Sequence, residues 1–227
     1  ESKIKDKTNS CSVIDPAYIW VLDKNYVKTK SEKLTLGISF RANPSDNFYD
    51  KNDTRLQERI DLYIKIANNY IDKYSGEVIL IPMNTFYIGG DDRKALYQIY
   101  NGIIRKDSVT LLSGYSTPDD IFKSISLCDV FLGMRFHSSV FACALTIPTI
   151  GIEYVERNGK VSRLFEALNI PHNSIYINDI FNTDLEKKLD ELIENKEDIK
   201  NRLKEKNKIL YQKFYTNIDN TLKDILD

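Results

Sequence analysis

The feature that most constrains the fold of this chain is an alternation between short apolar runs and longer segments with helical periodicity. The apolar runs are continuous, as expected for strands that helices cover on both faces. This succession predicts an α/β fold built on a Rossmann-like, doubly wound parallel sheet. The predicted strands are 34–40, 77–81, 108–112, 129–132, 149–152 and 174–177, and the predicted helices are 55–73, 91–104, a segment from 117, 138–145 and 161–168.

The two ends of the chain differ from the part that carries this alternation. Residues 1–33 hold one short apolar cluster between charged flanks, and we interpret them as a linker or the remnant of a preceding domain. Residues 34–182 form the predicted Rossmann-like domain. Residues 183–227 are charged and carry one apolar stripe, which predicts C-terminal helices packed on the domain, with a coiled-coil partner as the alternative. Because the sequence begins with Glu1, we expect a fragment of a longer protein.

Composition excludes several classes of function. The net charge of −1 gives no sign of a nucleic-acid-binding chain. The three cysteines lack metal-ligand spacing, which predicts free thiols in a reducing compartment and no metal site. The longest apolar stretch, 140–152, is too short to span a bilayer, and no signal-peptide pattern begins the chain. We therefore expect a cytoplasmic protein, with peripheral contact at the inner face of the membrane left open.

Polar residues at the ends of the predicted strands define a candidate site, because ligands of open parallel sheets bind at the carboxyl ends of the strands. Arg41 follows the first strand and Arg135 the fourth, and a guanidinium group suits a carboxylate or phosphate. The N–H groups near the start of the next helix add attraction for an anion, and His137 can move a proton near neutral pH. The strand-end candidates are Arg41, Asn84, Gly114, Arg135, Phe136, His137, Ser138, Ser139, Glu153, Tyr154 and Lys160.

Structural roles stay open for the same residues. An arginine at a strand end is often ion-paired, and His137 can cap a helix. Glu153 can pair with a basic residue of the following loop. Asp91 and Asp92 are explained by the dipole of the helix that they begin. No G-x-G-x-x-G motif follows the first strand and no Walker loop is present, so dinucleotide and ATP sites of those kinds are unsupported.

The stretch 128–142, followed by 148–154, resembles the signature of the polysaccharide pyruvyl transferase family. That signature has a strand, a Gly-x-Arg-x-His motif, a helix, a Pro-containing strand, and a Tyr before a Lys in the same order. The likeness runs from about Asp15 to Leu168. Phe136 stands where the family commonly has Leu, and Lys160 lies farther from Tyr154 than usual, which leaves the role of Lys160 open.

The resemblance implies a fold, an activity and residue roles. Family members look like GT-B enzymes, so this chain would be the C-terminal, donor-side domain and would lack its N-terminal partner domain. The family moves a pyruvyl group from phosphoenolpyruvate to two hydroxyls of a sugar in a glycan or lipid-linked acceptor, and releases phosphate. Phosphoenolpyruvate is then a co-substrate, and no cofactor is expected. Arg41 and Arg135 would hold the donor, Phe136 would line its pocket, and His137 would be the general acid.

Two other functions compete with this one. A GT-B glycosyltransferase with a nucleotide-sugar donor would use Glu153 to bind the ribose. A non-catalytic α/β module would serve assembly through the charged helical tail. The Arg135–His137 pair favours the pyruvyltransferase, because a nucleotide diphosphate site does not need it.

Overall fold

The computed structural model describes residues 14–24, 32–42, 55–86, 90–114 and 116–226. Its centre is a six-stranded sheet in the order β3-β2-β1-β4-β5-β6, and all neighbouring strands are parallel. This is the order of the Rossmann fold. The strands are β1 (Thr35–Ser39), β2 (Glu77–Leu80), β3 (Val109–Leu111), β4 (Val130–Gly133), β5 (Thr149–Glu153) and β6 (Ser174–Tyr176).

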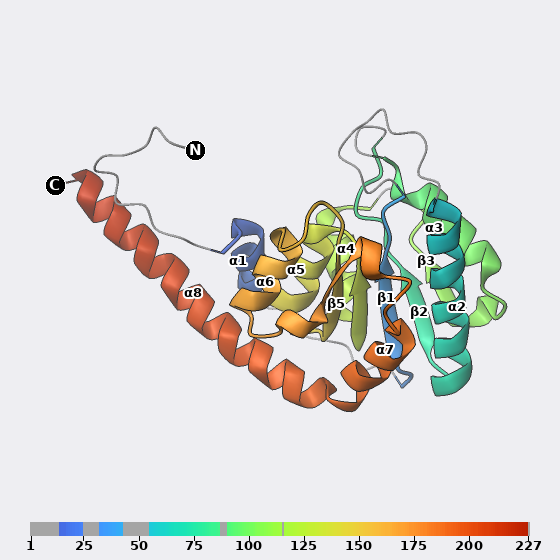
Figure 1. The fold of residues 1–227 in the computed structure, drawn as a ribbon. Coiled ribbons are helices and arrows are strands. Elements are labelled where there is room, and N and C mark those ends of the chain that lie inside the picture. The colour runs from blue at the N-terminus through green and yellow to red at the C-terminus, as the bar shows by residue number, and fades with distance from the viewer. Residues whose placement is uncertain (1–13, 25–31, 43–54, 87–89, 115, 227) are drawn as a thin grey trace.

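Helices cover both faces of the sheet (Figure 1). On one face α2 and α3 pack side by side, and α7 lies against β4 and β5 and is hydrogen-bonded to α2. On the other face lie α4, α5 and α6. The helices are α1 (Pro16–Asp23), α2 (Leu56–Tyr74), α3 (Asp92–Gly102), α4 (Pro118–Ser126), α5 (Phe136–Ala144), α6 (Lys160–Ala167), α7 (Leu185–Glu194) and α8 (Lys196–Leu226).

Two glycines let side chains pack closely on the α4–α5–α6 face. A Cβ on Gly37 of β1 would lie 2.4 Å from the Cδ2 atom of Phe131. A Cβ on Gly151 of β5 would lie 2.5 Å from Cγ1 of Val161, in the first turn of α6. Because contacts this short do not occur between real atoms, these positions require glycine, and the start of α6 is held directly against the end of β5.

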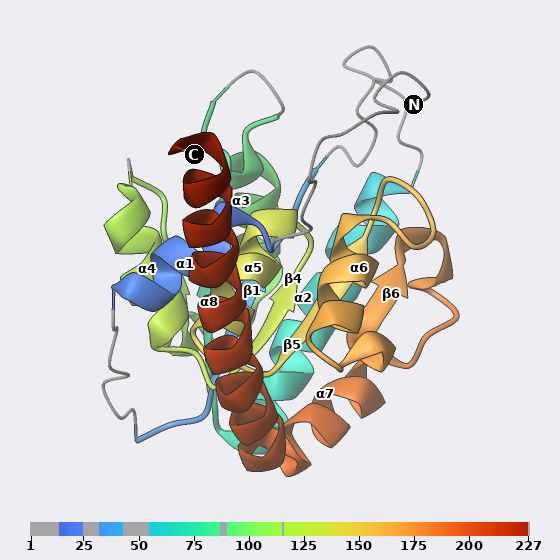
Figure 2. The ribbon, with the colours of Figure 1, turned by 90° about the vertical axis from the view of Figure 1, so that its left-hand side faces the viewer.

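The first and last helices pack together on the α5 side of the domain. Figure 2 shows α8 beside α1 and α5. The hydroxyl of Tyr18 on α1 donates to Oδ1 of Asn207 on α8 at 2.5 Å, and Asn207 donates to the carbonyl of Ala144 at 2.9 Å. Tyr18 and Asn207 are both buried. These bonds fix α8 to the ends of two helices that are far from it in sequence.

The predicted α/β fold is confirmed, and each predicted strand and helix is present within a few residues of its expected bounds. The helix expected to start at Ser138 begins at Phe136, so His137 lies in its first turn. Helix α1 falls inside the predicted linker, where no helix was expected, and Tyr18 is part of the main core. The domain boundaries themselves stay a prediction. Within the described ranges, no helix is long and apolar enough to cross a membrane.

The predicted apolar stripe at the C-terminus packs on the domain only in part. Leu185, Leu189, Leu192, Ile199 and Leu203 are buried. Further along α8 the helix extends past the body of the domain (Figure 1), and the stripe residues Ile218 and Leu222 are exposed by 37% and 50%.

We predict that Asn207→Ala lowers the free energy of unfolding by about 1–3 kcal/mol, because it leaves the buried Tyr18 hydroxyl and the Ala144 carbonyl without their partner. Urea denaturation followed by circular dichroism measures this. The matched control is Asn201→Ala at an exposed position of the same helix, with an expected change within about 0.5 kcal/mol. Equal effects of the two substitutions would contradict the assigned role of Asn207.

Candidate functional site

The sheet brings the ends of β1 and β4 together. Ser39 and Gly133 are register partners at the carboxyl ends of these neighbouring strands. The chain leaves β1 toward β2 and leaves β4 toward β5, so the strand order reverses between them. A crevice at such a reversal is the usual ligand site of an open α/β sheet. Arg41 and Arg135, each two residues beyond its strand, therefore lie at the position where a ligand is expected.

A cavity of about 430 Å³ opens at this edge of the sheet. Its walls come from the segment after β2, the start of α5, and the loop that joins β5 to α6. Seven of the predicted site residues line it, and one of them is Lys160, whose role the sequence leaves open. They are Asn84, Arg135, Phe136, His137, Glu153, Tyr154 and Lys160.

Arg135 is held by a buried carboxylate. Its Nη2 atom lies 2.6 Å from Oδ1 of Asp92, and its Nε atom lies 3.2 Å from both carboxylate oxygens. Nη2 also donates to the carbonyl of Gly90 at 3.2 Å. The same carboxylate accepts the backbone N–H groups of Met83 and Asn84 at 3.1 and 2.9 Å. Asp92 thus fixes the guanidinium plane of Arg135 relative to the end of β2.

The environment of Asp92 changes the pKa of its carboxyl group. Burial raises the pKa of the Asp92 carboxyl above its ordinary value, although the hydrogen bonds and charge of Arg135 and the N–H groups of Asn84 and Met83 act in the opposite direction. The Asp92 side chain is 1% exposed and that of Arg135 is 14% exposed. A charge buried this deeply is costly without its partner, so each residue depends on the other.

Two helices begin at the cavity, and in the part of the chain that the structure describes a side chain accepts the first N–H groups of only one of them. Glu153 accepts the backbone N–H groups of Val161 and Ser162 at 2.8 and 3.4 Å, so its carboxylate caps α6. Helix α5 has no side-chain cap hydrogen bond at Arg135. The N-terminus of α5, with its partial positive charge, therefore remains for an anion in the cavity. The buried, capping position of Glu153 does not favour a ribose-binding role for it.

His137 stands at the exposed rim of the cavity. Its Nε2 atom lies 3.8 Å from Oδ2 of Asp15, and its ring stacks on Phe141 at 5.9 Å between centroids. Asp15 is itself the N-cap of α1, where its Oδ1 atom accepts the N–H of Ala17 at 2.8 Å. His137 does not cap α5 with its side chain.

Arg41 lies behind the cavity wall and does not line it. Its side chain is buried, and its guanidinium carbon lies 4.5 Å from the ring centroid of Tyr154, which does line the cavity. The backbone N–H of Arg41 donates to the sulfur of Met134 at 3.4 Å. Arg41 thus contacts Tyr154, which forms part of the cavity wall. Direct binding of a ligand by Arg41 stays a prediction.

The remaining predicted residues have different placements. Ser138 and Ser139 are buried near the start of α5 and do not line the cavity, and the Ser138 hydroxyl donates to the carbonyl of Arg135 at 2.6 Å. Gly114 follows β3 and does not line the cavity. Asn84 lines it while its side chain shapes the turn after β2, donating to the carbonyl of Gly90 at 3.0 Å and accepting the N–H of Phe86 at 3.1 Å.

Asp92 is the functional residue that sequence reasoning missed. Its neighbour Asp91 does cap α3, accepting the N–H of Arg93 at 3.0 Å, as the dipole interpretation expected. One carboxylate is enough to cap the start of a helix. The second acidic residue, directly after Asp91, was therefore the sequence feature that could have indicated a further role for Asp92. That role is the ion pair with Arg135.

We predict that Arg135→Met lowers the free energy of unfolding by about 3–5 kcal/mol at pH 8, because it leaves Asp92 buried without a counter-charge. Arg135 lowers the pKa of Asp92, so its removal raises that pKa further above the value in the unfolded state. Protonation of Asp92 on lowering the pH therefore stabilises the variant more than it stabilises the wild type. The deficit should therefore shrink at pH 5, and the double variant Arg135→Met, Asp92→Asn should recover part of it at pH 8.

Chemical denaturation at the two pH values measures these differences. The matched control is Arg105→Met, which removes an exposed arginine whose Nη2 atom lies 3.7 Å from Asp107, with an expected change below about 1 kcal/mol. A deficit that is the same at both pH values, or that the double variant increases, would contradict the coupling between Asp92 and Arg135.

Comparison with known proteins assigns the chain to a family. A search of curated proteins finds no match. A model of the polysaccharide pyruvyl transferase family matches residues 1–156, which is more than half of the 227 residues. The match includes β1, β4, Arg135 and His137, and it ends in the loop that lines the cavity. This confirms the expected resemblance, and the chain belongs to the polysaccharide pyruvyl transferase family.

Proposed function

We propose that the cavity between β4 and α6 binds phosphoenolpyruvate and that the chain is the donor-side part of a ketal pyruvyltransferase. The observation that carries this proposal is the start of α5, where N–H groups without a side-chain cap, a fixed arginine and a histidine meet at the reversal of strand order. The family name supports transfer of a pyruvyl group to a polysaccharide. Phosphoenolpyruvate is the donor whose carboxylate and phosphate fit such an anion site.

The residues have distinct roles in the proposed reaction. His137 protonates the methylene carbon of phosphoenolpyruvate, which makes C2 electrophilic, and one sugar hydroxyl adds there and loses its proton. A second hydroxyl of the same sugar then attacks C2, the bond to the phosphate oxygen breaks, and phosphate leaves with the second hydroxyl's proton. The N-terminus of α5 and Arg135 stabilise the negative charge of the donor and of the leaving phosphate. Lys160, which also lines the cavity, can add to this stabilisation.

The acceptor is a sugar of a cell-surface polysaccharide or of its lipid-linked precursor, modified in the cytoplasm or at the inner face of the membrane. In the proposed GT-B arrangement a second Rossmann-like domain faces this one and supplies the rest of the acceptor site. The alternative nucleotide-sugar glycosyltransferase has less support, because Glu153 caps α6. A non-catalytic module would not need the fixed Arg135 beside an exposed histidine.

Thermal unfolding with added ligands tests the donor assignment. Phosphoenolpyruvate at about 100 times its dissociation constant should stabilise the protein by about 2.7 kcal/mol. Arg135→Lys, which keeps a positive charge near Asp92 and loses the guanidinium fork, should reduce this effect. Uridine diphosphate glucose is the comparison arm. Stabilisation by the nucleotide sugar and not by phosphoenolpyruvate would overturn the proposal in favour of a glycosyltransferase.

We predict that His137→Gln lowers kcat by about 10²–10⁴-fold, the range of general acid catalysis, without changing stability. The His137 side chain is 57% exposed, so its loss removes little packing. Release of phosphate from phosphoenolpyruvate in the presence of a sugar acceptor measures the rate. His172→Gln, at the other histidine and also exposed, is the control and should retain full activity. Loss of activity in both variants, or in neither, would contradict the role of His137.

A further inference from the structure

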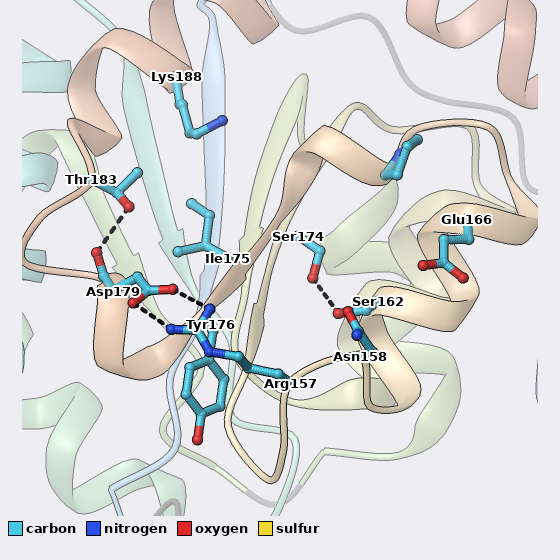
Figure 3. A pocket seen from close by; sticks show the side chains of 11 residues that line it. Arg157, Asn158, Ser162, Glu166, Ser174, Ile175, Tyr176, Asp179, Thr183 and Lys188 are labelled. Atoms are coloured by element: carbon cyan, nitrogen blue, oxygen red, sulfur yellow. Dashed lines mark hydrogen bonds and ion pairs between the residues drawn. The ribbon is translucent and has the colours of Figure 1, made fainter.

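A second cavity lies on the other side of the loop that joins β5 to α6. Tyr154 and Val155 of this loop line the donor cavity, whereas Arg157 and Asn158 line the second one. The second cavity has a volume of about 430 Å³ and is bounded by α6, β6 and the start of α7 (Figure 3). One short loop therefore separates two cavities of a size that suits small ligands.

The charges in the second cavity largely neutralise each other. Arg157 forms two contacts with the carboxylate of Asp179, at 2.8 and 2.9 Å, and its guanidinium carbon lies 4.8 Å from the ring centroid of Tyr176 (Figure 3). Lys188 donates to the carbonyl of His172 at 3.1 Å. Glu166 adds a second carboxylate, so the lining has two cations and two anions. This balance does not favour a phosphate or carboxylate ligand.

Neutral hydrogen-bonding groups lie beside these charges, together with Pro171, Ile175 and Tyr176. The hydroxyls of Ser162 on α6 and Ser174 on β6 lie 2.9 Å apart and face each other in Figure 3. The Asn158 amide lines the cavity beside Ser162. Hydroxyl and amide groups both donate and accept, as the hydroxyls of a sugar do, and a site built from such groups recognises a polyol better than an anion.

We propose that this second cavity is a subsite for a neutral sugar unit of the acceptor glycan. The inference rests on the proposed function, because it takes the acceptor to be a chain of sugars whose reacting unit lies at the donor cavity. A glycan that passes over the loop between Tyr154 and Arg157 places one unit beside the donor and a neighbouring unit in the second cavity. The subsite then selects acceptors of at least two sugars over single sugars.

Backbone amide chemical shifts of the ¹⁵N-labelled chain separate the two cavities. The probes are phosphoenolpyruvate and, separately, a panel of neutral di- to tetrasaccharides with their monosaccharides. Phosphoenolpyruvate should shift the amides of residues 135–137. At least one neutral oligosaccharide should shift the amide signals of residues 157–158, 162 and 174–176. The shifts should appear at a lower concentration of the oligosaccharide than of its monosaccharide. Inorganic phosphate is the anionic comparison and should leave the second set unchanged.

The variant for this test is Asn158→Gly combined with Glu166→Ala. Asn158 has a φ of 60°, which glycine adopts without strain, and Glu166 is exposed, so the fold should persist. The oligosaccharide dissociation constant should rise by about tenfold or more with phosphoenolpyruvate binding unchanged, since two hydrogen-bonding groups are lost. Glu194→Ala, at an exposed position of α7, is the control and should change neither.

Two outcomes would overturn the subsite. One is that no neutral oligosaccharide shifts the second set of amides while phosphoenolpyruvate shifts the first, which leaves the proposed function intact. The other is that oligosaccharide binding persists unchanged in the double variant. If phosphoenolpyruvate fails to shift residues 135–137, the proposed function fails instead, whatever the sugar probes show at the second cavity.

Discussion

The buried ion pair between Asp92 and Arg135 is the interaction on which the candidate site depends. Asp92 is the first residue of α3. Its carboxylate accepts hydrogen bonds from the N–H groups of Met83 and Asn84, which follow β2, and pairs with the guanidinium of Arg135, which follows β4. The segment after β2 and the start of α3 are thus fixed, through one side chain, to an arginine that is 43 positions away in sequence. An arginine held in this way keeps its position before a ligand arrives, which reduces the cost of ordering it on binding. The same burial makes each partner destabilising without the other.

The helices that start at this edge of the sheet differ in whether a side chain accepts their first N–H groups. At α3 and α6 a carboxylate already satisfies the first N–H groups, through Asp91 and Glu153. At α5 the N-cap residue Arg135 makes no side-chain cap hydrogen bond. Of these three helix starts, that of α5, beside Arg135 and His137, is therefore the one that we propose for an anion. Tyr154, with Arg41 against its ring, closes one wall of that place, and the loop beyond it leads to the second cavity.

Much of this could be predicted from the sequence, and the reasons for the rest are physical. Continuous apolar runs and helical periodicity predict a parallel sheet, and its strand ends predict a cluster around Arg135 and His137, because these patterns are local. The partner of Arg135 is 43 positions away in sequence, and only the packing of α3 brings Asp92 to it. The indirect position of Arg41 and the capping by Glu153 likewise depend on side-chain orientation across elements. Helix α1 was missed because it is only eight residues long and its apolar residues do not gather on one face, and its burial comes from α5 and α8.

The central claim is that the start of α5 receives the phosphoenolpyruvate anion. The most direct measurement is a crystal structure of the protein with phosphoenolpyruvate bound. The account predicts the phosphate or the carboxylate of the ligand within hydrogen-bonding distance of the first N–H groups of α5, with Arg135 still paired to Asp92 and His137 facing the methylene carbon. A ligand bound away from α5, for example in the cavity beside Arg157, would contradict it.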